Sequence, residues 1–150
     1  MMPSCSFPLK EMIVARFNAG EDLILKIRQI AVTHEVTAGM FTVIGAVDRA
    51  NYGFYHPKKK SYTNLNWEPT LDSSPALEIS SCMGNIALLD KDVVIHAHIT
   101  FTGEKGEIMG GHLLEGCRVN PTAELSLLKA DGELHRKHNE DLNLALLSIK

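Results

Sequence analysis

Three histidines, His96, His98 and His112, lie close together in the sequence and could act as one chemical group. In the segment VVIHAHITF, apolar residues alternate with His96, His98 and Thr100, which is the period of a β-strand. Residues on the same side of a strand lie about 6.5 to 7 Å apart along it. The two imidazoles therefore share a face and can reach one ion.

A third imidazole could reach the same face from the next strand. The run TGEKGE, residues 102–107, is typical of a turn and predicts a hairpin. Gly110 and Gly111 allow unusual backbone geometry immediately before His112. Three imidazoles with one further open position form the ligand set of an open zinc site, so we expect a divalent metal, zinc first, with a small ligand beside it. The alternative is that the histidines lie on an ordinary solvated strand face.

Other site types compete with this interpretation. Cys117 beside His112 could form a cysteine–histidine hydrolase, but Cys117 falls on the apolar side of CRVNPTAEL, which favours a buried thiol. Zinc-bound hydroxide with Glu115 or Glu124 as proton carrier would make an enzyme, although no motif defines a substrate. Glu104 lies too far from the histidine pair for a cupin site. The sequence favours a binding protein and leaves the enzyme open.

Polar residues also alternate with apolar ones along the run that follows the histidines, residues 117–128. We group them with Thr100 of the histidine strand and with Glu115, which lies just before the run. We interpret them as candidates for ligand contacts or for a subunit interface, with plain solvent exposure as the alternative. They are Thr100, Glu115, Arg118, Asn120, Thr122 and Glu124.

The elements before the histidines are a strand, a helix and a long strand. Residues 11–18 alternate in the manner of a strand, and residues 19–35 have helical spacing with Glu21 and Asp22 in the first turn. Residues 40–55 predict one long bent strand or two in succession, with a bulge at the internal glycine. The segment HPKKKSYTN then predicts an exposed loop.

Four further strand-like runs follow, separated by the turn signals Gly-Asn, DKD, TGEKG and EG. The tail, residues 135–149, is ambiguous between a short helix and a strand. One helix among many strands predicts an α+β domain with a mostly antiparallel sheet and one main helix packed on it.

Length and composition bound the protein class. The chain has 150 residues, 45% of them hydrophobic, which predicts a single domain over residues 1–150. The net charge of -3, with both signs mixed, disfavours a polyanion partner. Three widely spaced cysteines without a leader segment favour reduced thiols in the cytoplasm. No apolar run reaches the roughly 18 residues that cross a bilayer, so we expect a soluble protein without a membrane partner.

The run from His96 to Leu127 resembles the most characteristic portion of the plants-and-prokaryotes conserved (PPC) domain in its free-standing bacterial and archaeal form. RFNAGEDL, FTVIGAVDRANYGFY and LEISSCMGNIALLD resemble other parts of that domain in the same order, so the resemblance covers about residues 11–147. It implies an α+β subunit assembled as a homotrimer. It also implies a metal held by the histidines at positions 96, 98 and 112.

The PPC family is often labelled as DNA-binding because its plant relatives carry AT-hook segments. This chain contains no Arg-Gly-Arg core flanked by prolines, and plant members generally lack the three histidines. Lys58, Lys59 and Lys60 could still contact DNA, since three such loops in a trimer would form a basic patch. A trimeric metal-binding module for a small ligand or for regulation is the first hypothesis, and a DNA-binding regulator is the alternative.

Overall fold

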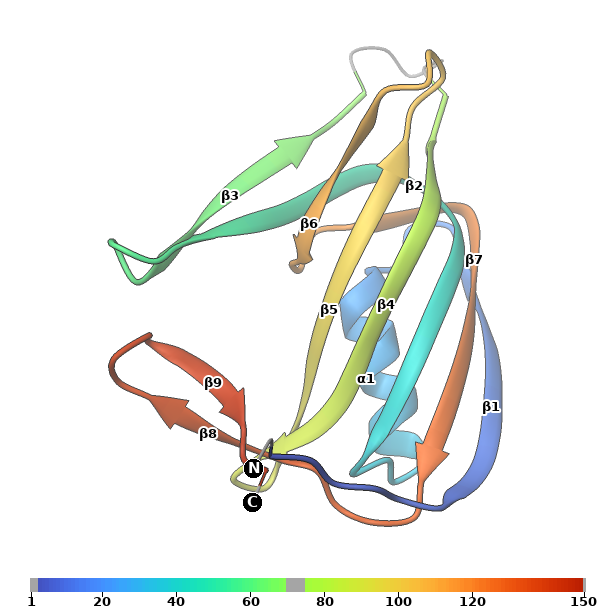
Figure 1. The fold of residues 1–150 in the computed structure, drawn as a ribbon. Helices are drawn as coiled ribbons and strands as arrows, with labels where there is room; N and C mark the ends of the chain where they lie inside the picture. Colours follow the sequence, from blue (N-terminus) through green and yellow to red (C-terminus); the bar gives the residue numbers. More distant parts are fainter. Residues whose placement is uncertain (1–2, 70–74, 150) are drawn as a thin grey trace.

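A computed structural model describes residues 3–69 and 75–149, which form one nine-stranded sheet and one helix (Figure 1). The strands are β1 (Leu9–Asn18), β2 (Gly39–His56), β3 (Ser61–Trp67), β4 (Leu77–Leu89), β5 (Asp92–Thr102), β6 (Ile108–Leu113), β7 (Arg118–Ala130), β8 (His135–Asn139) and β9 (Leu144–Leu147). They are ordered β1-β7-β2-β6-β5-β4-β8-β9, with β3 paired to β2. All pairs are antiparallel except β4 with β8. The predicted sheet class is therefore confirmed.

The long strand β2 makes the sheet curve. It pairs with β6 near one end and with β4 near the other, so β2, β6, β5 and β4 close a circuit of hydrogen-bonded strands. The register shifts at Gly45, where a bulge was predicted, and β2 remains one continuous bent strand.

The helix α1 (Leu23–Thr33) lies inside the curve of the sheet and contacts β5, β1 and β7 (Figure 1). Its buried face includes Leu23, Ile27 and Ala31, which recur at helical spacing. Asp22 is the N-cap, and its carboxylate accepts a hydrogen bond from Leu25 N at 3.1 Å. The prediction that Glu21 and Asp22 lie in the first turn was wrong, because both precede the helix and Asp22 satisfies one of its free N–H groups instead.

Two predicted loops are strands in the structure. Residues 61–64, assigned to an exposed loop, begin β3, because β2 offers its free edge as a hydrogen-bonding partner. Gly84 and Asn85, assigned to a turn, lie inside β4 between β2 and β5. A Cβ at position 84 would lie 2.5 Å from the His96 carbonyl oxygen and 2.7 Å from Phe41 Cζ, so the glycine permits close strand packing rather than a turn. The ambiguous tail forms the β8–β9 hairpin.

The core lies between α1 and the concave face of the sheet. Ala97, Ile99 and Phe101 of β5 are buried in it, and they alternate with the histidines as predicted. Packing of these three side chains fixes which face of β5 the histidines take, since a slip of one residue would reverse every side chain. Within the described residues, no helix has the length and apolar character needed to cross a membrane.

Candidate metal centre

The β5–β6 hairpin carries the three histidines. His98 lies directly opposite His112 in the antiparallel register, and His96 lies two residues before His98 on the same face of β5. The turn closes through a hydrogen bond from Gly103 N to the Glu107 carbonyl at 2.9 Å. The hairpin predicted from TGEKGE is confirmed, and its register brings His112 to the other two histidines.

Gly110 allows β6 to pair this closely with β5. A Cβ at this position would overlap the Ile99 carbonyl oxygen and would lie 2.9 Å from Thr100 Cα. Both are backbone atoms of β5, so a side-chain rotation cannot relieve the clash. A Cβ on Gly111 would lie 2.7 Å from the Gly53 carbonyl oxygen of β2. Because β5 approaches Gly110 and β2 approaches Gly111 this closely, both positions ahead of His112 require glycine.

The three imidazoles are close enough to share an ion. Their candidate ligand atoms all lie within 4.8 Å of one another, and the ring centroids of His96 and His112 are 5.1 Å apart. In a tetrahedral zinc site with bonds near 2.1 Å, ligand nitrogens lie about 3.4 Å apart, so modest side-chain rotations complete the site. His96 and His112 are partly buried, whereas His98 is exposed.

Burial keeps two of these imidazoles neutral. The pKa of His112 is lowered to about 4, mainly by burial and then by the charges of the neighbouring His96, His98 and Arg136. Burial, followed by the charges of Arg136 and His98, also lowers the pKa of His96. Neutral imidazole is the form whose nitrogen lone pair binds a metal, so the environment favours ligation at pH 7.

The buried Nδ1 atom of His112 provides a test of whether a metal fits here. It has no hydrogen-bond partner within the described part of the chain. A buried polar atom without a partner costs about 1–3 kcal/mol, and an ion coordinated by Nδ1 itself would remove that cost. The donor set of three imidazoles also suits zinc. The residues present therefore fit a divalent metal.

A pocket of about 230 Å³ adjoins the histidines. Residues of the two hairpin arms, β2–β3 and β8–β9, line it together with β5 and β6. The arms extend from the same side of the sheet (Figure 1). The tips of the arms are linked, because the Tyr55 hydroxyl donates to the Leu142 carbonyl at 2.5 Å and Asn143 Nδ2 donates to the Lys60 carbonyl at 3.2 Å. The pocket walls are mostly apolar residues of β5 and β9. Its polar groups are those of Tyr62, His96, His112 and Arg136.

Tyr62 and Arg136 are the residues of this pocket that the sequence analysis missed. The ring of Tyr62 lies 4.8 Å from that of His112, centroid to centroid. Arg136 donates to Asn85 Oδ1 at 2.8 Å, to the Ala145 carbonyl at 2.7 Å and to His96 Nδ1 at 3.2 Å. No local pattern marks Arg136, since only the parallel pairing of β8 with β4 brings it to the histidines.

The structure brings only some of the other candidate residues near the histidines. Thr100 lines a larger hollow of about 500 Å³ that His98 also lines. Glu115 is not brought there, because its carboxylate pairs with Arg28 of α1 at 3.5 Å. Glu124 is exposed on β7, which pairs with β1 and β2 rather than with the histidine strands.

The remaining polar candidates of β7 bind elsewhere. Arg118 Nε and Asn120 Nδ2 donate to the two carboxylate oxygens of Asp48 at 2.6 and 2.7 Å. The Thr122 hydroxyl donates to the Phe17 carbonyl at 3.0 Å. These three residues therefore form contacts between β7 and its neighbours, away from the histidine pocket.

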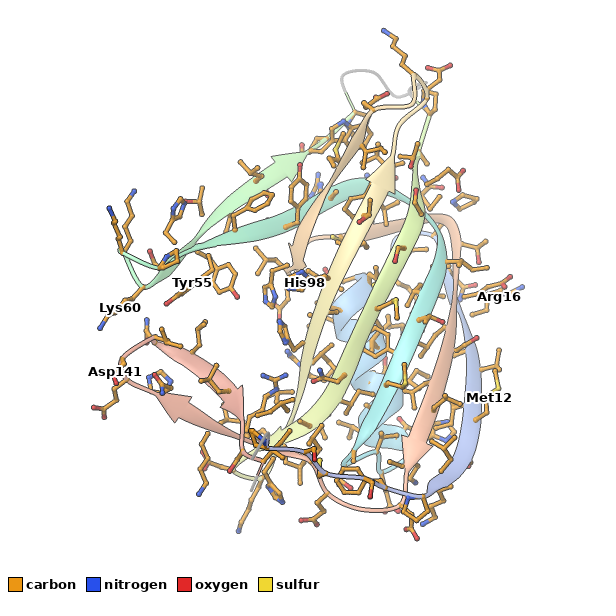
Figure 2. The ribbon with its side chains drawn as sticks, in the orientation of Figure 1. Met12, Arg16, Tyr55, Lys60, His98 and Asp141 are labelled. Carbon is orange, nitrogen blue, oxygen red and sulfur yellow. The ribbon has the colours of Figure 1, made fainter. Side chains whose placement is uncertain are left out.

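The lysines and the cysteine occupy opposite environments. Lys58, Lys59 and Lys60 are exposed between β2 and β3, and Figure 2 shows Lys60 at the tip of this arm. Cys117 is completely buried, and burial raises the pKa of its thiol to about 11. This burial confirms the prediction of a buried structural thiol at Cys117. A protonated buried thiol is a poor nucleophile, which argues against a cysteine–histidine hydrolase.

Comparison with known proteins agrees with this geometry. A family model for the Plants and Prokaryotes Conserved domain, abbreviated PCC or PPC, matches residues 6–131. The chain belongs to this family. The resemblance predicted from the histidine run and its flanking segments is therefore confirmed. Among curated proteins, a search found no match to this PPC chain.

Solved structures of PPC-like proteins share the whole fold. A PPC protein from Pyrococcus horikoshii is 27% identical with a TM-score of 0.86, and the match covers 98% of this chain and 97% of that one. A metal-containing protein from Archaeoglobus fulgidus is 28% identical with a TM-score of 0.85, covering 97% and 99%. A protein from Bacteroides thetaiotaomicron, provisionally described as DNA-binding, is 23% identical with a TM-score of 0.83, covering 95% and 96%, and it shows the fold alone.

Proposed function

We propose that this PPC protein is a metal-binding module that holds one divalent ion, zinc first, through His96, His98 and His112. The observation that carries the proposal is the convergence of three ligand atoms within 4.8 Å, one imidazole of which has a buried nitrogen without a partner. The similarity to a metal-containing protein from Archaeoglobus fulgidus supports it. A bound ion would leave room for a small ligand in the adjoining pocket, which suits a ligand-binding or regulatory role.

Metal analysis of the purified protein tests this proposal. We expect about one zinc per chain in the wild type and a loss of at least about tenfold in zinc affinity in the variant His96→Ala/His98→Ala, because two of three ligands are gone. The matched control is His34→Ala/His56→Ala, since both of these histidines are exposed and lie outside the cluster. Equal metal content in the wild type and in His96→Ala/His98→Ala would refute the three-histidine site.

The metal's identity needs its own measurement. Imidazole ligands also bind copper and nickel, and copper binds most such sites more tightly than zinc. We therefore propose elemental analysis of protein purified without added metal, followed by competition between zinc, nickel and cobalt. Retention of another metal in place of zinc would correct the choice of ion and leave the site intact.

We also propose that the protein assembles as a homotrimer through the convex face of the sheet. Residues directly opposite each other on neighbouring strands share a face of the sheet. One such row crosses β1, β7, β2, β4 and β5, and its exposed members include Val14 of β1, Met83 of β4 and His98 of β5. Met12 and Met40 lie in the next row, and both are about half exposed or more. Thr42 and Ser126 lie between Val14 and Met83 in the first row, so the stripe is mixed, and its exposed apolar side chains favour an interface. It runs up to the candidate metal site.

Light scattering coupled to size-exclusion chromatography tests the assembly. We expect the mass of three chains for the wild type and of one chain for Met12→Glu/Met40→Glu, because a carboxylate at a buried interface is costly. Leu25→Glu is the matched control, since Leu25 is also an exposed apolar residue but lies on α1. A monomeric wild type would refute the trimer.

DNA binding is the second candidate, and the exposed lysines at the tip of the β2–β3 arm favour it. The net charge of -3 weighs against it. A mobility shift with duplex DNA at low salt, lost in Lys58→Ala/Lys59→Ala/Lys60→Ala, would support this function. Absence of any shift at low salt would remove it.

A further inference from the structure

Arg136 places an unpaired positive charge at the wall of the histidine pocket. Its side chain is only 9% exposed, yet it takes part in none of the ion pairs found in residues 3–69 and 75–149. The neutral acceptors around it are Asn85, His96 and the Ala145 carbonyl, and its Nε atom has no partner among the described residues. A buried guanidinium without a counter-ion is costly, so the site favours an anion.

The three ligands add no negative charge. His96, His98 and His112 form a cluster that contains no described Asp or Glu. A divalent ion bound at Nε2 of neutral His96 would leave the imidazole proton on Nδ1, which lies 3.2 Å from the guanidinium, so Arg136 would lose this acceptor and gain two positive charges beside it. Three positive charges without one acid is a local imbalance that a bound anion would relieve.

The pocket beside Arg136 sets the size and character of that anion. Its volume of about 230 Å³ equals about eight water molecules of 30 Å³ each, so it admits a molecule of about eight non-hydrogen atoms. Val94, Ile95, Leu144 and Leu146 line the rest of the wall. A ligand that matches this lining has a charged group beside Arg136 and a short apolar chain against the apolar residues.

We propose that this pocket binds a small carboxylate with a short aliphatic chain, and that Arg136 pairs with the carboxylate beside the metal-binding histidines. The inference rests on the proposed function, because the metal ion would be the second source of positive charge beside Arg136. A carboxylate fits better than a phosphate, because one guanidinium is the single charged donor that lines the pocket, and a phosphate would leave most of its oxygens against apolar walls. Arg136 already donates three of its five N–H hydrogens, to Asn85, Ala145 and His96, and one hydrogen on Nη1 remains for a charge-assisted hydrogen bond to a carboxylate.

The test compares an acid with its neutral amide. Isobutyrate and isobutyramide have the same shape and differ in charge. Binding is followed in zinc-loaded and in chelator-treated protein by nuclear magnetic resonance, using the side-chain Nε–H signal of Arg136. We expect isobutyrate to shift this signal and to bind at least about tenfold more tightly than isobutyramide, the difference that a charge-assisted hydrogen bond supplies.

Variants at Arg136 separate recognition from folding. Arg136→Met should bind acid and amide equally, Arg136→Lys should still prefer the acid, and the exposed control Arg49→Met should behave as wild type. If Arg136→Met does not fold, the wild-type comparison and Arg136→Lys decide the question. Equal affinity of the wild type for acid and amide, or no binding of either, would overturn the inference.

Zinc content measured on the same samples distinguishes the two proposals. Protein that holds zinc but does not prefer the acid would overturn the carboxylate inference alone. Protein that holds no zinc but still prefers the acid through Arg136 would overturn the metal site alone and support recognition by the guanidinium.

Discussion

The substitution Gly110→Ala tests how the hairpin positions the metal site. The new Cβ would overlap the Ile99 carbonyl oxygen and lie 2.9 Å from Thr100 Cα, and neither backbone atom can rotate away. Overpacking of this kind costs about 1–3 kcal/mol. For a chain of this length, 1 kcal/mol corresponds to about 2–4 °C in the melting temperature, so we expect a decrease of about 2–12 °C. Strand β6 should also move away from β5 and carry His112 with it.

Thermal melting and zinc competition with a chromogenic chelator measure the two consequences together. We expect the zinc affinity of Gly110→Ala to fall by at least about tenfold, as when a ligand loses its orientation. The control Ile108→Ala changes the same strand at a residue that is 74% exposed, and its stability should stay within about 0.5 kcal/mol of wild type. Lower stability with unchanged zinc affinity would refute the argument that the β5–β6 register positions His112.

Three further outcomes follow from burial. The pKa of His112 is lowered to about 4 from its ordinary 6.5, so the unfolded state binds a proton before the folded state does as the pH falls. Metal-free protein should therefore lose about 1–2 kcal/mol of stability between pH 6.5 and 4, measured by urea unfolding. Burial raises the thiol pKa of Cys82 to about 12 and of Cys117 to about 11, so at pH 8 a disulfide reagent should modify only the exposed Cys5 in the folded protein. Phe101→Ala should cost about 3–5 kcal/mol in urea unfolding, because its ring is fully buried; a loss below about 1 kcal/mol would contradict that packing.

Local patterns predicted the centre of the site because the relevant geometry is local. Alternation along one strand places His96 and His98 on a common face whatever the rest of the chain does. The turn after β5 is short, so the partner strand had to return beside it and bring His112. The helix was predicted for the same reason, since its apolar spacing lies within a dozen residues of sequence.

Local preferences failed where distant strands compete for the backbone. Gly84 and Asn85 favour a turn by themselves, but β2 and β5 hydrogen-bond to both sides of this segment and hold it extended. Residues 61–64 have the composition of a loop, yet the free edge of β2 makes them a strand. Long-range pairing outweighs a propensity of a few tenths of a kcal/mol per residue.

The sequence by itself determined which imidazoles could meet, because strand alternation and a short turn are properties of neighbouring residues. Only the tertiary structure decided what surrounds them. Arg136 is far from the histidines in sequence, and it reaches His96 through the parallel pairing of β8 with β4 and the hydrogen bond to Asn85. That contact depends on where the last hairpin packs, a free energy shared among many distant residues, and it places a buried positive charge beside three neutral ligands.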